Sequence, residues 1–197
     1  MTEPGRPPLP QPGLRERHKI TTRRALEDAA LALFARDGFD ATPVEAVAEA
    51  ARVSPRTFHR YFSAKEEVLD MGWPERRERL LEATLAVEGD TDLTVAAVAL
   101  RVVAADFEGE RDRVRLRARA TATSAALRGR TADTLGAWEA ALAEGLARRR
   151  DLPQPDAAAT VAAAAAMAVW RTAVGWWLTG RGDVPLGEQV RRAFAAL

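Results

Sequence analysis

The polar residues best suited to specific recognition lie together on one short segment, PRTFHRYF at residues 55–62. On a helix its aromatic residues share one side, which leaves Arg56, Thr57, His59 and Arg60 facing outward. Arginine can donate two hydrogen bonds to a guanine edge and threonine can contact a thymine methyl, so such a helix could enter a DNA major groove. The same residues also fit a solvated helix face, and composition alone does not separate these two interpretations.

Three helix starts in close succession would hold this segment in place. Thr42 can cap a helix whose first residue is a proline, and Glu45 can complete a capping box with it. Ser54 can cap the segment described above, and Ser63 with Glu66 forms a second capping box after it. Two short helices joined by a turn of about three residues have the spacing of a helix-turn-helix motif.

The order of residues around these starts resembles the TetR family of bacterial transcriptional regulators. Residues 23–69 read RRALEDAALALFARDGFDATPVEAVAEAARVSPRTFHRYFSAKEEVL, and VSPRTFHRYFSAKEEVL is the most specific part of the match. Two residues depart from the family pattern, because Arg52 replaces a usual glycine and His59 replaces a usual Tyr or Phe. That glycine commonly adopts a left-handed conformation, which would cost an arginine roughly a kcal/mol. We therefore expect either an altered turn or a compensating contact of Arg52, such as a phosphate.

The resemblance implies a division of labour at the DNA. Arg56 and Thr57 are expected to reach base edges, whereas His59 and Lys65 are expected to contact phosphates, as Thr42 and Tyr61 would. A two-fold dimer would place its two reading helices about 34–36 Å apart, in successive major grooves. The complete set of expected DNA-binding residues is Thr42, Pro43, Arg52, Ser54, Arg56, Thr57, His59, Arg60, Tyr61 and Lys65.

Composition indicates an all-α protein of 197 residues without disulfides. The chain has no cysteine, two histidines and a net charge of +1, so any DNA affinity must come from local clustering of basic residues. His18 and His59 cannot form a metal cluster, and neither a GxSxG motif nor a phosphate-binding glycine loop is present. We expect no cofactor, no metal and no enzymatic activity, with a small helical enzyme as the less favoured class. A reducing cytoplasm fits the lack of cysteine.

We predict a disordered tail at residues 1–13, a three-helix DNA-binding domain at 14–67 and a helical effector-binding and dimerisation domain at 68–197. About nine helices are expected in all. Longer helices are expected at residues 14–37, 93–107, 111–119, 133–150 and 156–179, and from about residue 185. The 111–119 run alternates with period two, which is a strand signal, but its neighbours favour a helix with arginines on two sides.

The helix that follows the DNA-binding domain is interrupted by Gly72 and Pro74. Proline inside a helix removes a hydrogen bond, so we expect a bend or a restart near Trp73. Such a bend could be a lever between the domains or a structural kink without a further role.

The last two long helices are expected to pair with those of a second copy, as in the family. Residues 156–179 are long enough to cross a membrane, but the segment is rich in alanine and contains Arg171, so a dimer is favoured. The C-terminal half also resembles the mycofactocin-regulator-type C-terminal domain of TetR regulators. Expected dimerisation residues are Trp170, Val174, Trp177, Leu178, Val190 and Phe194.

The resemblance further implies an effector pocket in the second domain. Trp138 is a candidate lining residue, although core packing is the favoured interpretation of it, and Arg115 and Arg119 are expected near the pocket mouth. These residues favour a hydrophobic or amphipathic effector that carries an anionic end. The sequence thus predicts a ligand-responsive, homodimeric repressor of a palindromic operator. An activator, a regulator without a small-molecule ligand and a membrane-associated protein are the alternatives.

Overall fold

The computed structural model describes residues 13–180 and 184–197, and every regular element in these ranges is a helix. The predicted tail at residues 1–13 therefore lies outside the described residues, apart from Gly13. The predicted all-α fold is confirmed, and the period-two run of arginines is helical. The elements are α1 (Leu14–Asp37), α2 (Val44–Ala50), α3 (Pro55–Tyr61), η1 (Lys65–Leu69), α4 (Trp73–Ala86), α5 (Asp92–Ala104), η2 (Ala105–Glu110), α6 (Arg111–Thr123), α7 (Ala125–Arg149), α8 (Ala157–Thr179) and α9 (Leu186–Phe194).

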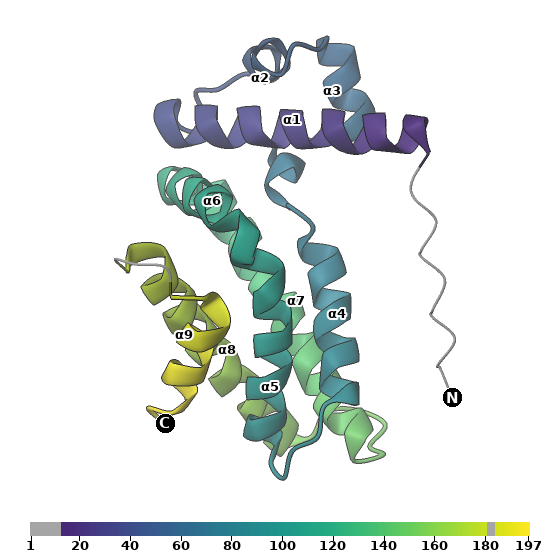
Figure 1. Ribbon diagram of the computed structural model, residues 1–197, viewed down its shortest axis with the longest axis vertical. Coiled ribbons are helices and arrows are strands. Elements are labelled where there is room, and N and C mark those ends of the chain that lie inside the picture. The colour runs from purple at the N-terminus through teal and green to yellow at the C-terminus, as the bar shows by residue number, and fades with distance from the viewer. Residues whose placement is uncertain (1–12, 181–183) are drawn as a thin grey trace, which may run out of the picture.

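The helices form two units (Figure 1). Helices α1, α2 and α3 lie together at one end, and α4 to α9 form an elongated bundle below them. Helix α1 crosses the end of this bundle and packs against α6, while the short helix η1 packs against α1. The N-terminal unit is therefore attached to the bundle by helix packing as well as by the chain itself.

The first unit is built around aromatic side chains that point inward from α1 and α3. Phe34, Phe58 and Phe62 are almost completely buried. Gly38 ends α1 with a φ of 89°, and Phe39 then packs edge-on against Phe34 with 5.0 Å between ring centroids. A positive φ suits glycine, so this residue lets the chain reverse and starts the path toward α2.

The bundle has its own aromatic cluster, formed by Trp73, Phe107, Trp138 and Trp170. Trp73 and Trp138 have ring centroids 5.1 Å apart, and Trp138 and Trp170 lie 5.7 Å apart. These rings come from α4, η2, α7 and α8, so one cluster connects four elements. Helices α4 and α7 approach closely at Gly145, where a Cβ would lie 2.7 Å from Thr84 Cγ2.

The chain restarts at Trp73, as predicted. Met71 and Gly72 both have positive φ values, 45° and 74°, and α4 begins at the next residue with Pro74 in its first turn. Proline is tolerated there because its missing N–H would have no partner inside the helix. The break at residues 70–72 follows η1 and lies a few residues after the predicted domain boundary at residue 67.

Two predicted helix limits differ from the structure. Helix α7 begins at Ala125 and not at Asp133, because Gly129 is tolerated within it. Helix α5 ends at Ala104, and the chain continues to Glu110 as the tighter helix η2. Both differences lengthen or tighten helical structure without changing the order of the elements.

Candidate DNA-reading helix and ligand cavity

Helix α3 is fixed by a cap at its start and by aromatic anchors on one side. The Ser54 hydroxyl accepts a hydrogen bond from the Thr57 amide at 3.1 Å, which confirms the predicted cap. The anchors Phe58 and Phe62 are 0% and 1% exposed. A short helix held in this way can present its other side rigidly, which binding to a groove requires.

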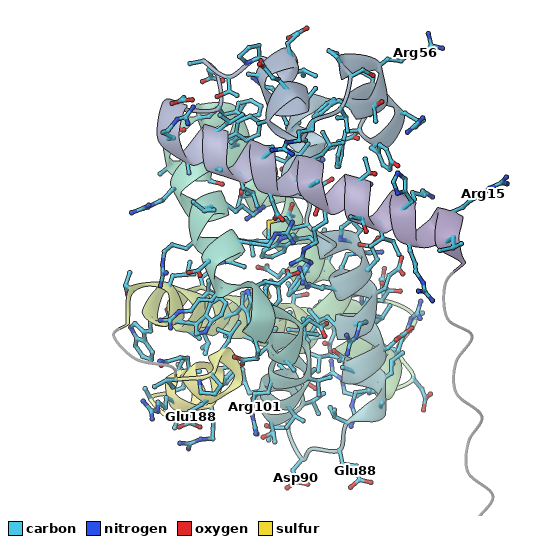
Figure 2. All side chains as sticks on the ribbon, turned by 45° about the horizontal axis from the view of Figure 1, so that its top comes forward. Arg15, Arg56, Glu88, Asp90, Arg101 and Glu188 are labelled. Atoms are coloured by element: carbon cyan, nitrogen blue, oxygen red, sulfur yellow. The ribbon has the colours of Figure 1, made fainter. Side chains whose placement is uncertain are left out.

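The outer side of α3 carries the predicted recognition residues. Arg56, His59 and Arg60 are exposed and Thr57 is half-buried. Together with Ser54, these residues line a surface hollow of about 370 Å³. In Figure 2, Arg56 projects from α3 away from the rest of the molecule, at the end opposite Glu88, Asp90 and Glu188. These donors can reach an external partner without any rearrangement of the fold.

The turn before α3 keeps a left-handed residue although no glycine is present. Arg52 has a φ of 57°, and the next amide, of Val53, donates to the Ala48 carbonyl at 2.9 Å. An altered turn is therefore not the solution that this chain adopts. Arg52 accepts roughly a kcal/mol of backbone strain, and its side chain is exposed beside the reading helix.

The helix starts on either side of α3 differ from the prediction. Thr42 does not cap α2, because its hydroxyl donates to the Gly38 carbonyl at 2.8 Å and Pro43 is the N-cap residue. Ser63 bonds Glu67 through its amide, at 2.8 Å, and through its hydroxyl; it does not bond Glu66. Both corrections have one cause, since each hydroxyl donates to a nearby oxygen, of Gly38 or of Glu67, and does not accept from a helix amide.

Lys65 and Thr42 belong to the internal structure of this unit. The Lys65 ammonium donates to the carbonyls of Phe39 and Thr42, at 2.7 and 2.9 Å, and lies 4.1 Å from the Phe39 ring centroid. Thr42 is 3% exposed. We therefore withdraw the Thr42 side chain as a phosphate ligand. Lys65, which is half-buried, joins the loop before α2 to η1 and has one donor left for a phosphate.

The remaining expected contacts surround α3. Pro43 is exposed at the start of α2, and Tyr61 is half-buried with the Arg60 guanidinium carbon 5.3 Å from its ring centroid. Arg23 of α1 lies 4.6 Å from the Phe62 ring centroid, so α1 adds a cation close to the same surface. Arg15 also projects outward from the first turn of α1 (Figure 2). Basic side chains from α1 and α3 thus flank the reading face.

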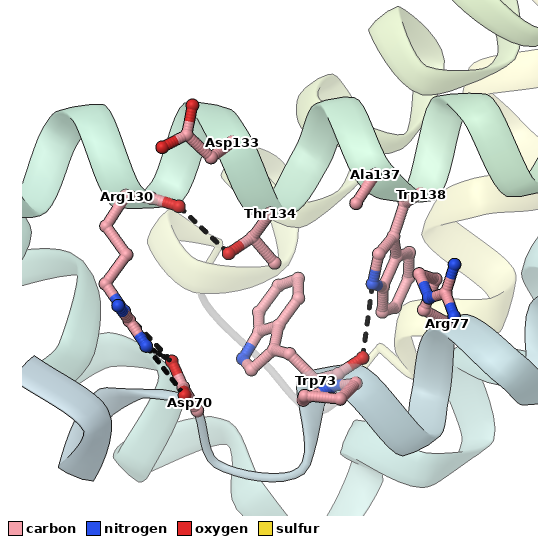
Figure 3. A pocket seen from close by; sticks show the side chains of 9 residues that line it. Asp70, Trp73, Arg77, Arg130, Asp133, Thr134, Ala137 and Trp138 are labelled. Carbon is pink, nitrogen blue, oxygen red and sulfur yellow. Dashed lines mark hydrogen bonds and ion pairs between the residues drawn. The ribbon is translucent and has the colours of Figure 1, made fainter. Parts of the chain in front are cut away.

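Two cavities lie in the bundle and share Trp73 as a wall. The first, of about 340 Å³, is shown in Figure 3 and includes Trp138, which is 0% exposed. The Trp138 indole donates to the Trp73 carbonyl at 3.3 Å. Trp138 is therefore both a core residue and a wall residue. The cavity is lined by Asp70, Trp73, Pro74, Arg77, Arg130, Asp133, Thr134, Ala137 and Trp138.

The second cavity, of about 240 Å³, lies between α4, α6, α7 and α8 and is mainly apolar. Its walls are Trp73, Val114, Arg117, Ala118, Thr121, Thr131, Leu135, Trp170, Arg171, Val174 and Leu178. Arg115 and Arg119 line neither of these two cavities, so their predicted place at the mouth of an apolar pocket is wrong; Arg115 instead lines a polar hollow at the start of α6. Arg119 is exposed, and Arg115 bonds the Leu178 carbonyl and the Asp112 carboxylate.

Arg117 is the cavity residue that sequence reasoning missed. It is 8% exposed; its Nε donates to the Leu69 carbonyl at 2.9 Å, and its Nη2 lies 3.4 Å from the Thr131 hydroxyl. Its guanidinium carbon lies 4.7 Å from the Trp73 ring centroid. Burial lowers the pKa of Arg117 to about 10, which still leaves it cationic at neutral pH. Helical spacing could have indicated that Arg117 faces inward, because it lies three residues from Val114 and from Ala120, which are both buried.

The expected dimerisation residues are mostly internal to the subunit. Trp170, Trp177 and Val190 are at most 2% exposed, which leaves no side-chain surface for a second copy. Val174 and Leu178 are half-buried in the cavity wall, and Phe194 is half-buried on α9. Trp170 and Trp177 are covered by other helices of the same subunit and not, as expected, by a second copy.

Another side of α8 remains uncovered. Val161 is 67% exposed and Trp176 is 45% exposed, with Ala168 and Thr172 exposed between them at helical spacing. Helix α8 is long and apolar enough to span a membrane by composition, yet 44% of that window is buried within the protein. Its buried side packs against α7 and α9, as in the core helix of a bundle.

Across residues 13–180 and 184–197, no group of three or more His, Cys, Asp or Glu side chains could hold a metal ion.

Comparison with known proteins agrees with this arrangement. Residues 26–70 match the family model of the tetR family of bacterial regulatory proteins, and residues 91–197 match the MftR C-terminal domain. The HTH-type transcriptional regulator TcmR of Streptomyces glaucescens is 53% identical over 57 residues, which are 29% of this chain and 25% of that protein. The chain thus matches a quarter of the length of this curated relative.

Solved structures extend the likeness over both units. Thermus thermophilus FadR, a TetR family repressor in complex with lauroyl-CoA, is 24% identical with a TM-score of 0.54 over 88% of this chain and 91% of that one. NalD of Pseudomonas aeruginosa, the secondary repressor of the MexAB-OprM multidrug efflux pump, is 19% identical with a TM-score of 0.61 over 92% and 98%. At these identities the likeness shows the fold alone. With both family models matched in order, the chain belongs to the TetR family of bacterial regulatory proteins and is a DNA-binding transcriptional regulator.

Proposed function

We propose that this regulator is a homodimeric repressor that reads a palindromic operator through α3 and leaves it when an apolar effector fills the bundle. The observation that carries the proposal is the rigid outward presentation of Arg56 and Thr57 on a capped helix. One such helix contacts too few base pairs for an operator, so a second copy must supply the other half-site.

The second copy is proposed to bind on the uncovered side of α8. Val161 and Trp176 are large apolar side chains that remain exposed, and the small residues between them allow close approach of another helix. Exposed aromatic and apolar residues of this kind are typical of interface cores. The buried Trp170 and Trp177 are not part of this surface.

The effector is proposed to enter the two cavities that share Trp73. Their walls are mostly apolar, and they lie directly below the break at residues 70–72. The structurally similar FadR of Thermus thermophilus binds lauroyl-CoA, and NalD is a repressor. Those two properties support an apolar effector and a repressing action here. The effector must bind the DNA-free form more tightly than the bound form, since otherwise it cannot shift the equilibrium.

The base-reading role is tested with DNA that contains the inverted repeat upstream of the protein's own gene. Arg56→Ala should lose about 1–3 kcal/mol of discrimination at one base position, while its affinity for random DNA changes little. Fluorescence anisotropy with single-base operator variants measures this preference. Arg101→Ala, at the opposite end of the molecule (Figure 2), is the matched control and should behave as wild type. Uniform loss of affinity in the Arg56 variant, with preference unchanged, would overturn the assignment.

A further inference from the structure

The arginines of α6 differ sharply in how their charge is neutralised. Arg113 forms ion pairs with Glu27, at 2.7 Å, and with Glu110, at 3.3 Å. Arg117 is more deeply buried, yet no ion pair to it occurs within residues 13–180 and 184–197. The nearby Asp70 carboxylate is already bound at both oxygens by Arg130, at 2.8 and 2.9 Å (Figure 3). The inner cation of α6 therefore lacks a counter-ion of its own.

A buried cation without a counter-ion is costly, because the protein interior solvates charge poorly. Desolvation lowers the pKa of Arg117, and the positive charge of Arg130 adds to this effect against the opposing charge of Asp70. Arg117 donates to two neutral oxygens, of Leu69 and Thr131, so other N–H groups of its guanidinium remain available to a ligand. Groups held at such a cost in a cavity wall are typical of binding sites.

The cavity beside Arg117 provides the space, and its Trp73 wall carries an unused donor. Its walls are mostly apolar on α4, α7 and α8, as Trp73, Leu135 and Trp170 illustrate. The Trp73 indole N–H is buried and finds no hydrogen-bond partner among the described residues. Another arginine, Arg171, also lines the cavity, but it is exposed and therefore screened by water. One buried cation in an apolar chamber matches a ligand with a single negative charge.

We propose that Arg117 receives the carboxylate of an otherwise apolar effector in the cavity between α4, α6, α7 and α8, an inference that rests on the effector-responsive function proposed above. The planar guanidinium can bind a carboxylate through two parallel hydrogen bonds. A phosphate dianion would leave one charge unmatched in an apolar chamber. The occupant is therefore a carboxylic acid with an aliphatic or aromatic body.

Occupation of this site acts on the chain break above it. The Leu69 carbonyl, which Arg117 Nε holds, belongs to the last residue of η1, immediately before residues 70–72. A carboxylate that binds the spare donors is a stronger acceptor than a neutral carbonyl, so it draws the guanidinium toward the ligand and away from the Leu69 carbonyl. Loss of that bond frees the end of η1, which packs against α1 of the DNA-reading unit. Ligand charge is thus linked to the position of α3 through one side chain.

The experiment compares matched probes by isothermal titration calorimetry. Decanoate and 2-naphthoate carry the carboxylate, and 1-decanol and 2-naphthylmethanol are their neutral counterparts. Wild type should bind each acid more tightly than its alcohol. Arg117→Met keeps the length of the side chain without its charge and should weaken acid binding about ten- to a hundredfold, with alcohol binding little changed. Arg117→Lys should retain the preference for the acid.

Two control variants separate this site from general charge effects. Arg119→Met removes an exposed arginine of the same helix and should bind all four probes as wild type does. Arg171→Met removes the exposed cation of the same cavity and should reduce acid binding less than Arg117→Met does. Equal binding of acids and alcohols by wild type, or equal losses in the Arg117 and Arg119 variants, would overturn the proposal. Failure of wild type to bind either acid at its solubility limit would overturn it as well.

Operator binding distinguishes this inference from the function on which it rests. Arg117→Met should still bind the operator, and decanoate should release wild type from it but not this variant. If operator binding persists while the probe pattern fails, only the role of Arg117 is wrong. If wild type binds no operator, the proposed function itself fails. Should Arg117→Met not fold, the acid preference of Arg117→Lys together with the wild-type probe pairs decides the question.

Discussion

The reading helix α3 and the cavity helix α6 are both rich in arginine but use it in opposite ways. Arg56 and Arg60 are exposed and form no ion pair within the described part of the chain. Arg113 is bound by carboxylates from α1 and η2, and Arg117 is enclosed in a cavity wall. An exposed arginine suits a polyanion that approaches from solvent, whereas an enclosed one suits a small anion that leaves water behind. The surroundings of each arginine, more than its residue type, indicate its partner.

The largest expected effect comes from removing the support of α3. Phe58 is 0% exposed, and its ring centroid lies 5.4 Å from that of Phe62. Phe58→Ala should cost about 3–5 kcal/mol and abolish operator binding. Urea unfolding and calorimetry with decanoate would show an early transition of the first unit and intact ligand binding. One cooperative transition, with ligand binding lost as well, would instead mean that the two units fold together.

The junction between the units should respond to acid through Glu110. Burial alone would raise its pKa, but the bond and charge of Arg76, with the charges of Arg113 and Arg24, together lower it below the ordinary 4.5. A lowered folded-state pKa contributes stability that is present above 4.5 and is lost as the pH falls through the folded value. Glu110→Gln should therefore cost about 1–3 kcal/mol at pH 7.

The same substitution should also flatten the dependence of stability on pH below the ordinary value of 4.5. Thermal unfolding between pH 3 and pH 7 measures both effects. A variant that keeps the acid sensitivity of wild type would place that sensitivity elsewhere. The matched control is Glu82→Gln, which changes an exposed carboxylate of α4.

A smaller effect, on assembly alone, is expected on α8. Trp176→Glu puts a charge on the proposed dimer surface and should weaken self-association at least tenfold, or by about 1.4 kcal/mol. Because Trp176 is 45% exposed, the fold of the subunit should survive. Light scattering across a dilution series gives the dissociation constant. Leu85→Glu, at a similarly exposed apolar residue of α4, should leave the assembly unchanged, and equal loss in both variants would remove α8 as the interface.

The smallest effect is expected at the turn before α3. Arg52→Gly relieves the left-handed strain and should stabilise the protein by about 0.5–1 kcal/mol. If Arg52 also contacts a phosphate, the variant should bind all DNA more weakly, and its salt dependence should fall by about one unit of slope. Urea unfolding and anisotropy at several salt concentrations test the two parts separately. Higher stability with unchanged DNA affinity would remove Arg52 from the DNA interface.

Local signals predicted the first unit well. The Ser54 cap and the aromatic anchors of α3 depend on residues a few positions apart, so they can be predicted from the sequence alone. Thr42 and Ser63 show where such signals fail. Each has an alternative oxygen within reach of its hydroxyl, at Gly38 and Glu67 respectively, and only the folded loop reveals it.

The second unit was harder to predict because its site depends on which side of each helix is covered. In the run at residues 111–119, positions four apart share a side, so Arg113 and Arg117 lie on one side, while Arg115, which bonds the Leu178 carbonyl, and the exposed Arg119 lie on another. Sequence identified the run but not its inner members. The tryptophans of α8 were misassigned for a similar reason. Their spacing shows that something covers them, but it does not distinguish the same subunit from another copy.

The break at residues 70–72 has a mechanical consequence. No continuous helix crosses it, so α4 and the first unit cannot rotate together as one rigid helix. Movement can reach the first unit through the packing of α6 against α1 and through side chains that tie the break to the bundle: Arg117 at Leu69, Arg130 at Asp70 and Arg76 at Met71. Three guanidinium groups therefore hold the break to the bundle. A ligand that drew one of them to another oxygen would loosen this joint without breaking a helix.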